Sequence, residues 1–296
     1  MSQKLSKRQN ATVGAAAGIV DITCIQWAYY MKNARQQGMP LTLNPRVLYR
    51  GYSANCGNIA VGTGFQFFIN GYVEKLMTGG IQRKLSSSEQ ISSGFLAGFT
   101  SGVVASPAEL VMTQQQVKGG SLGSNIVNIL QQGPNNVFRG LTTTCMREGI
   151  FAAAYLGIAP SLRSELSHRA PNMNSEVLRV ASAVAGAAVC GALSHPFDTI
   201  KTCMQGDVER KTFGNVRQTA STIWSSGSAG AFYRGIEFRF LRQVWQVWVL
   251  DLLREKLSPA LYPAEFGLTA STHSSLGLYI PQALWSQGQS LDRQAS

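Results

Sequence analysis

The chain has 296 residues, of which 45% are hydrophobic and only 14% are charged, and its formal net charge is +11. Soluble domains carry roughly 25% charged residues, so too few remain here to cover a soluble surface. The composition therefore indicates an integral membrane protein. Its basic residues flank apolar segments instead of clustering in a polar domain, so the excess charge suits an anionic membrane surface or anionic substrates and excludes nucleic acid.

Six apolar segments follow one another along the chain, each near the roughly 20 residues that a bilayer-spanning helix needs. All contain small residues or a charge, which is typical of helices that pack closely or line an aqueous cavity. The segments are residues 11–31, 52–77, 91–112, 144–162, 177–200 and 236–253. Short amphipathic helices are predicted between them, near residues 41–48, 124–132 and 215–225.

Two landmarks recur along these segments and predict internal repetition. Acidic residues near the ends of the odd-numbered segments, Asp21, Glu109 and Asp198, are 88 and 89 residues apart. An aromatic-Arg-Gly turn recurs at residues 49–51, 138–140 and 233–235, with its arginines 89 and 95 residues apart. The shared period predicts three repeats, at about residues 10–80, 90–168 and 176–256, in a single transmembrane domain of residues 1–256. Residues 257–296 are predicted to form a polar C-terminal extension.

One motif carries the chemistry of these repeats. Residues 196–201 read Pro-Phe-Asp-Thr-Ile-Lys, and Gln205 follows. The proline removes a helix hydrogen bond and kinks the helix, while the acid and the base three residues later share a helix face. Charges at membrane depth must pair with one another or face a cavity. Together with the Arg-Gly turns and the period, this motif resembles the mitochondrial carrier family over nearly all of residues 10–256.

The resemblance implies an all-α fold of six transmembrane helices in three tandem repeats, a pseudo-threefold bundle with short amphipathic helices on the matrix side of the mitochondrial inner membrane. In that family the acid of one repeat pairs with the base of the next, and a glutamine braces the pair. Glu109 is expected to pair with Lys201, whereas Asp198 and Asp21 face Cys24 and Met112 and find no base. At most one of three pairs is therefore expected. The gate residues implied are Asp21, Glu109, Gln116, Asp198, Lys201 and Gln205.

The family resemblance also places substrate contacts eight residues after each repeat arginine, at Asn58, Arg147 and Arg242, with Glu148 beside the second. An arginine at mid-membrane depth is a functional hypothesis by default, and its guanidinium can hold a carboxylate with two hydrogen bonds. The resemblance links an Arg-acid pair to amino-acid-like substrates, ahead of keto acids and di- or tricarboxylates. The alternative is that Arg147 and Glu148 satisfy each other and bind nothing.

Three glycines, Gly51, Gly140 and Gly235, begin the even-numbered helices. Backbone N–H groups at these starts could hold a lipid phosphate, and the resemblance implies cardiolipin. The plainer interpretation is a tight turn that needs glycine.

The sequence favours a transporter of a small anionic or zwitterionic metabolite that works by alternating access. It carries no phosphate-binding loop, nucleophile elbow or metal-ligand spacing, so neither an enzyme nor a cofactor or metal site is expected. Two alternatives stay open. The fold could serve as a non-transporting structural subunit of a larger membrane complex, with a protein partner on residues 257–296. It could also leak protons through an unpaired Asp21 or Asp198.

Overall fold

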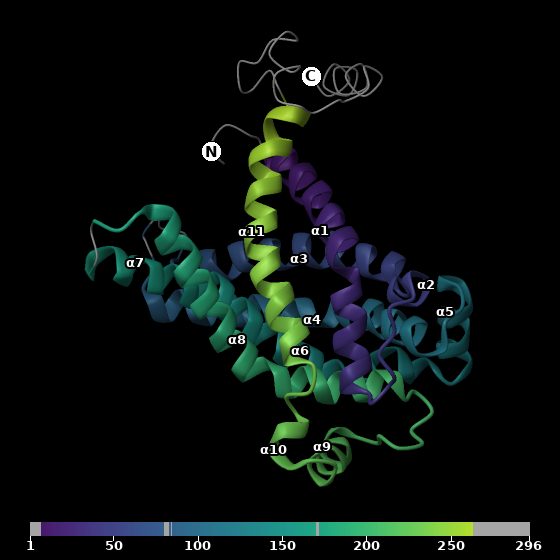
Figure 1. Cartoon of the computed structure of the whole chain (residues 1–296). Helices are drawn as coiled ribbons and strands as arrows, with labels where there is room; N and C mark the ends of the chain where they lie inside the picture. The colour runs from purple at the N-terminus through teal and green to yellow at the C-terminus, as the bar shows by residue number, and fades with distance from the viewer. Residues whose placement is uncertain (1–6, 80–82, 84, 170–171, 263–296) are drawn as a thin grey trace. The chain divides into compact units, whose positions relative to one another are not determined.

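The computed structural model describes residues 7–79, 83, 85–169 and 172–262 (Figure 1). Within these ranges every regular element is a helix. The elements are α1 (Lys7–Gln36), α2 (Pro45–Leu48), α3 (Tyr52–Met77), α4 (Ser87–Lys118), α5 (Leu122–Gln131), η1 (Pro134–Phe138), α6 (Leu141–Ala152), η2 (Ala153–Ile158), α7 (Ala159–Arg169), α8 (Ser175–Gly206), α9 (Val216–Ser225), α10 (Ser228–Ala231) and α11 (Ile236–Leu261).

The chain divides into two compact units, and α1 and α11 contribute to both. One unit comprises residues 18–250, and the other is built from residues 1–17 and 251–296. The candidate site lies wholly within residues 18–250.

The six predicted apolar segments are all helical, and α3 has the predicted bounds. The fourth segment is a continuous helical run in which η2, a π-helical stretch, joins α6 to α7. Two helices of the described chain, Ser87–Lys118 and Val180–Gly206, are long and apolar enough to cross a bilayer by length and composition. The predicted short helices correspond to α2, α5 and α9.

Local sequence explains where several helices begin. Ser86 and Glu89 form a capping box at the start of α4, and Asn215 and Gln218 form another at the start of α9. In each box two backbone N–H groups that have no helical partner are satisfied by side chains. Pro107 and Pro196 lie inside α4 and α8, where each removes one helix hydrogen bond.

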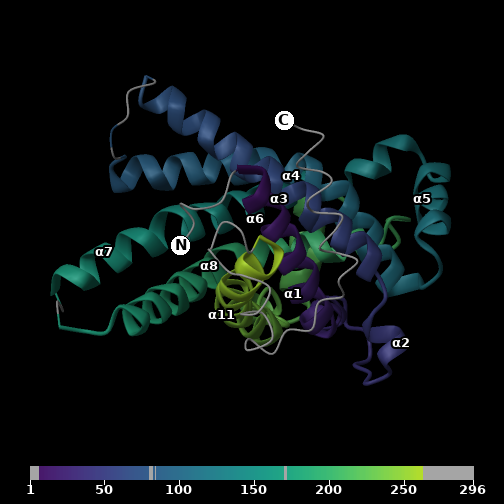
Figure 2. The same ribbon diagram turned by 90° about the horizontal axis from the view of Figure 1, so that it is seen from above.

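Small residues bring α4 and α6 into backbone contact. A methyl group added to Gly102 would lie 2.6 Å from the Cα atom of Cys145. One added to Gly94 would lie 2.9 Å from the carbonyl oxygen of Ala152. This close approach fixes α6, and the charged residues on it, against α4. In both views α3 lies beside α4, and α7 lies beside α8 (Figures 1 and 2).

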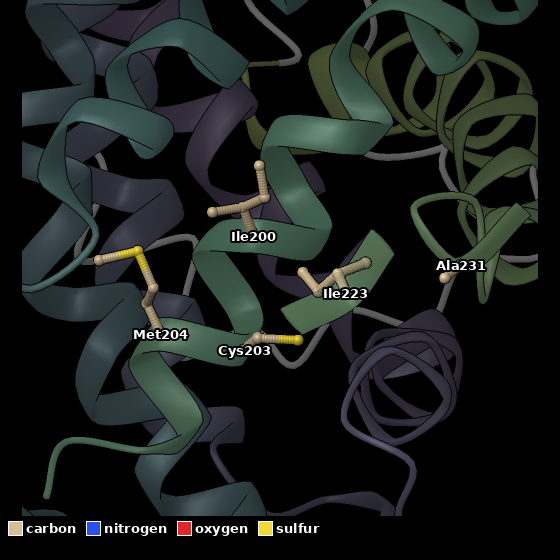
Figure 3. Packing of buried hydrophobic residues seen from close by; sticks show 5 residues of the cluster. All are labelled: Ile200, Cys203, Met204, Ile223 and Ala231. Carbon is tan, nitrogen blue, oxygen red and sulfur yellow. The ribbon is translucent and has the colours of Figure 1, made fainter. Parts of the chain in front are cut away.

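The short helices are anchored to the C-terminal ends of the long ones. Ile200, Cys203 and Met204 of α8 form a buried cluster with Ile223 of α9 and Ala231 of α10 (Figure 3). A second cluster joins Leu110 of α4, Ile129 of α5 and Val208. These apolar contacts hold each amphipathic helix by its inner face and leave its outer face exposed, with Ile126 and Trp224 40% and 58% accessible.

Candidate substrate and gate site

Three turn glycines, one before each even-numbered helix, share one backbone conformation. Gly51, Gly140 and Gly235 have φ values of 80°, 79° and 80°, the left-handed conformation that glycine adopts most readily. The interpretation as tight turns is therefore confirmed, whereas a lipid phosphate at these turns stays a prediction.

Each turn glycine also rests on another helix. A methyl group on Gly51 would lie 2.8 Å from Met112 of α4, and one on Gly235 would lie 3.0 Å from the carbonyl oxygen of Lys32 in α1. On Gly140 it would lie 3.6 Å from the carbonyl oxygen of Lys201 in α8. Met112, Lys201 and Lys32 therefore occupy equivalent places.

This equivalence corrects the alignment of the first repeat by eight residues. Lys32, and not Cys24, matches Met112 and Lys201, and a glutamine follows each of the three by four residues (Gln36, Gln116 and Gln205). Tyr29 then takes the place expected for Asp21, three residues before the base. The sequence period misled because the connection in the first repeat is shorter: α2 has four residues, whereas α5 and α9 each have ten.

Two ion pairs join α1, α4 and α8 in this layer. Lys201 Nζ lies 3.1 Å from Glu109 Oε2, the contact that the resemblance implied. Lys32 Nζ lies 2.6 Å from Asp198 Oδ2, so the expectation that Asp198 lacks a base is wrong. The Lys32 and Asp198 side chains are 10% and 1% exposed, which makes this pair a buried one. The third combination, Tyr29 and Met112, carries no charge.

The glutamines bind mostly to neighbouring backbone and amide groups. Gln36 Nε2 does donate to Asp198 Oδ2, at 3.0 Å, and so braces the second ion pair. Gln205 Nε2 donates to the carbonyl oxygens of Ser106 and Arg139, both at 3.3 Å, and Gln116 Oε1 accepts from Asn33 at 2.5 Å. These bonds tie the helix ends together at the level of the ion pairs.

Arg147 is the centre of the charged cluster. Its guanidinium lies 2.6 Å from Glu109 Oε1, contacts the Glu148 carboxylate, and lies 3.6 Å from Asp198 Oδ1. The alternative in which Arg147 and Glu148 satisfy each other thus describes this conformation of the protein. Arg147 also links the two ion pairs, because it touches the carboxylate of each.

Arg239 belongs to the same cluster and was missed in the sequence. Its Nη1 atom lies 3.4 Å from Asp198 Oδ2, and its Nη2 donates to Ser194 Oγ at 2.5 Å. The side chain is 2% exposed. An arginine inside the predicted segment 236–253 is itself a signal because of its membrane depth, whereas the fixed offset from the Arg-Gly turn points only to Arg242.

Arg242, the other predicted contact arginine, is held by Tyr29 of α1. Arg242 Nη1 donates to the Tyr29 hydroxyl at 2.8 Å, and its guanidinium carbon lies 4.5 Å from the centre of that ring. Asp21 of α1 is the acidic neighbour of Arg242. Asn58 of α3 is partly exposed, and among the described residues no hydrogen bond or ion pair joins it to the other three.

The cluster has a small excess of positive charge. Its acids are Asp21, Glu109, Glu148 and Asp198, and its bases are Lys32, Arg147, Lys201, Arg239 and Arg242, so the formal charge of these nine residues is +1. Such a site can accept an anion without carrying a large uncompensated charge itself.

Two other features lie apart from this cluster. An open hollow of about 490 Å³ between the end of α5 and the connection after α8 shares no residue with it. Toward the C-terminus, α11 continues to Leu261, past the predicted end of the transmembrane domain at residue 256. The rest of the predicted extension, residues 263–296, lies outside the described part of the chain.

Comparison with known proteins settles the family. The family model for mitochondrial carrier proteins matches residues 83–169 and 174–261, more than half of the chain. The chain belongs to the mitochondrial carrier family. The resemblance predicted from the Arg-Gly turns and the residue 196–201 motif is thereby confirmed, and the matched ranges overlap the second and third predicted repeats.

Several curated transporters are similar to this carrier. The mitochondrial glycine transporter YMC1 of Saccharomyces cerevisiae is 26% identical over 67% of this chain and 69% of its own length. The mitochondrial glycine transporter of Laccaria bicolor is 28% identical over 42% of this chain and 41% of its own length. The mitochondrial tricarboxylate transport protein of Rattus norvegicus is 29% identical over 71% of this chain and 70% of its own length. These relatives are transporters, which fits the expectation that the carrier is not an enzyme.

Proposed function

We propose that this carrier moves a small amino-acid-like zwitterion across the mitochondrial inner membrane by alternating access. In this proposal three repeats, the first of them divergent, supply six transmembrane helices. The observation that carries the substrate class is the Arg147–Glu148 contact. The similarity to glycine transporters supports it independently.

The Arg147–Glu148 pair suits a zwitterion because it can be exchanged without loss of charge balance. A substrate carboxylate takes the place of Glu148 on the Arg147 guanidinium, and the substrate ammonium group moves onto the released Glu148. One ion pair becomes two. A keto acid offers no ammonium group, so it leaves Glu148 unpaired among buried groups, and an unpaired buried charge costs about 3–5 kcal/mol. Asn58 and Arg242 border the site in this proposal.

The same arginine couples binding to the gate. The pairs Glu109–Lys201 and Asp198–Lys32 hold the matrix ends of α1, α4 and α8 together, and Arg147 touches both carboxylates. A substrate on Arg147 competes with Glu109 and Asp198 for its N–H groups, which weakens the closed state relative to the open one. Gln116 and Gln205 add hydrogen bonds to the closed state, and cardiolipin at Gly51, Gly140 and Gly235 would hold the outer rim.

Uptake into proteoliposomes tests this function. The purified carrier is reconstituted, and entry of labelled glycine and other small amino acids is measured against protein-free vesicles. Arg147→Ala is expected to abolish uptake. The matched control is Arg163→Ala, because Arg163 is an exposed arginine of α7 outside the cluster. Full uptake by Arg147→Ala, in protein with an unchanged melting temperature, would refute the assignment of the site.

A structural subunit without transport is the second candidate. It is favoured by one observation: in this conformation Arg147 already has Glu109 and Glu148 as partners. Solubilisation of native membranes in mild detergent tests it. A stoichiometric complex that contains this chain, together with an absence of uptake by the purified carrier, would replace the transport proposal.

A further inference from the structure

Tyr29 stands where α4 and α8 carry an acid, at the level of the Glu109–Lys201 and Asp198–Lys32 ion pairs. The equivalent positions on α4 and α8 carry Glu109 and Asp198, and both of these carboxylates bind cations on neighbouring helices. Tyr29 instead turns to Arg242 of α11. Its hydroxyl accepts a hydrogen bond at 2.8 Å, and its ring lies under the guanidinium at 4.5 Å. Tyr29 thus contacts Arg242 with both its hydroxyl group and the π face of its ring.

We propose that Tyr29 is a specificity-determining residue that excludes dicarboxylates by keeping Arg242 from binding a second carboxylate. The inference rests on the proposed function, since it assumes that Arg147 receives the first carboxylate. A dicarboxylate needs a second guanidinium fork at the site. Of the two α11 arginines in the cluster, Arg239 already binds Asp198 and Ser194, which leaves Arg242. With Nη1 bound to the Tyr29 hydroxyl and the ring against one face, the Nη1–Nη2 edge of Arg242 cannot present two parallel N–H groups to another carboxylate.

Charge balance points the same way. Asp21 lies near Arg242 and offsets its charge. The other seven members of the cluster, three acids and four bases, have a formal charge of +1. One added carboxylate neutralises this excess, and an added zwitterion leaves it unchanged. The two negative charges of a dicarboxylate would outnumber this single positive charge, and the remaining buried negative charge would need Arg242 as its partner.

A neutral partner for Arg242 has a consequence that an acid would not have. A carboxylate at residue 29 would add a second negative charge beside Arg242, whose charge Asp21 already offsets, whereas a phenol accepts a hydrogen bond from Arg242 without adding charge. The site therefore keeps its attraction for anions while it rejects those that need two forks. Because Tyr29 occupies a donor of Arg242, the site discriminates against dicarboxylates without losing contacts to the preferred substrate.

Tyr29→Phe isolates the hydroxyl, because it keeps the ring over Arg242. Uptake of labelled glycine and of labelled succinate is measured in proteoliposomes for the wild type and this variant. Tyr72→Phe is the matched control, since Tyr72 of α3 is 57% exposed and outside the cluster. Arg147→Ala is included as the variant without the first carboxylate site, and melting temperatures verify that each protein is folded.

The expected result is that the wild type takes up glycine and rejects succinate. Tyr29→Phe should raise the succinate-to-glycine uptake ratio by about tenfold or more. The Arg242 guanidinium loses its acceptor on Tyr29 in this variant and can donate to the second carboxylate of succinate instead. Tyr72→Phe should leave the ratio unchanged, and Arg147→Ala should lose both activities. Should Tyr29→Phe prove unstable, succinate-dependent thermal stabilisation of Tyr29→Leu serves the same purpose, because leucine also lacks the acceptor.

Two results would overturn the inference while the transport proposal stands. One is succinate uptake by the wild type at a rate similar to that of glycine. The other is a ratio in folded Tyr29→Phe equal to that of Tyr72→Phe. A wild-type carrier that neither transports nor is thermally stabilised by either compound would overturn the proposed function and the inference with it.

Discussion

Lys32 offers the sharpest test of the corrected alignment of the first repeat. Lys32→Met gives α1 the residue that α4 carries at the equivalent place, Met112, and removes the ammonium group that lies 2.6 Å from Asp198. Loss of one partner from a buried ion pair costs about 3–5 kcal/mol. Asp198 keeps Arg239 at 3.4 Å and Gln36 at 3.0 Å, so we expect a smaller loss than this, about 2–3 kcal/mol.

A loss of that size is measurable as a shift in melting temperature. For domains of 150–250 residues, 1 kcal/mol corresponds to about 2–4 °C, so Lys32→Met should melt about 4–12 °C below the wild type. The assay is thermal unfolding of the purified carrier in one detergent at one pH. The double-mutant cycle with Asp198→Asn then isolates the pair, and its coupling free energy should exceed about 1 kcal/mol.

The control for this cycle replaces Asp198→Asn with Asp21→Asn. Asp21 lies eleven residues before Lys32 on the same helix, about 16 Å along its axis, so these two changes should add within about 0.5 kcal/mol. Additive effects of Lys32→Met and Asp198→Asn would mean that the two residues do not interact. The reasoning from the three turn glycines would then be refuted.

Two further predictions concern a turn and a connection. Gly51→Ala should destabilise the carrier by about 1–3 kcal/mol, because the added methyl group would meet Met112 at 2.8 Å in a left-handed turn. Gly38→Ala is the control: it has a similar backbone strain at φ 68° but open space around it, so it should lose only about 1 kcal/mol. Equal losses in thermal unfolding would contradict the packing role of Gly51. Burial raises the pKa of the Asp207 carboxyl, but N–H groups of residues 211–213 outweigh it and hold the pKa below its ordinary 3.8. Its stabilising contribution is therefore complete above about pH 5 and is lost as the pH falls below 3.8, so the melting-temperature gap between the wild type and Asp207→Asn should shrink with acid, and a constant gap would contradict this.

Most of the helical architecture could be predicted from the sequence, because apolar length and periodicity report directly on helices. The segment 52–77 matched α3 at both ends. The alignment of the first repeat could not be predicted in this way. A conserved period assumes equal connections, and the four-residue α2 breaks that assumption. The spacing Lys32-x₃-Gln36, identical to Lys201-x₃-Gln205, was a local signal that favoured the correct alignment.

The sequence predicted which residues belong to the candidate site better than it predicted which residues they contact. Arg147 and Glu148 stood out because charges are rare in apolar helices, and the expected Glu109–Lys201 contact is present. Which acid reaches which base depends on how the helices face one another, and no single helix encodes that. The Tyr29–Arg242 contact joins the first and third repeats, and Arg239 reaches Asp198 on another helix of its own repeat, so both contacts became visible only in the folded chain.

The Lys32–Asp198 pair also constrains how the protein can be made. The two residues are 166 positions apart in the chain. At about 5–20 residues per second of synthesis, α1 exists for about 8–30 seconds before Asp198 has been added. During that interval the ammonium group of Lys32 lacks its carboxylate partner and must stay near water, because an unpaired buried charge is costly. Within the described chain, α1 thus gains its ionic partner only after α8 has been made.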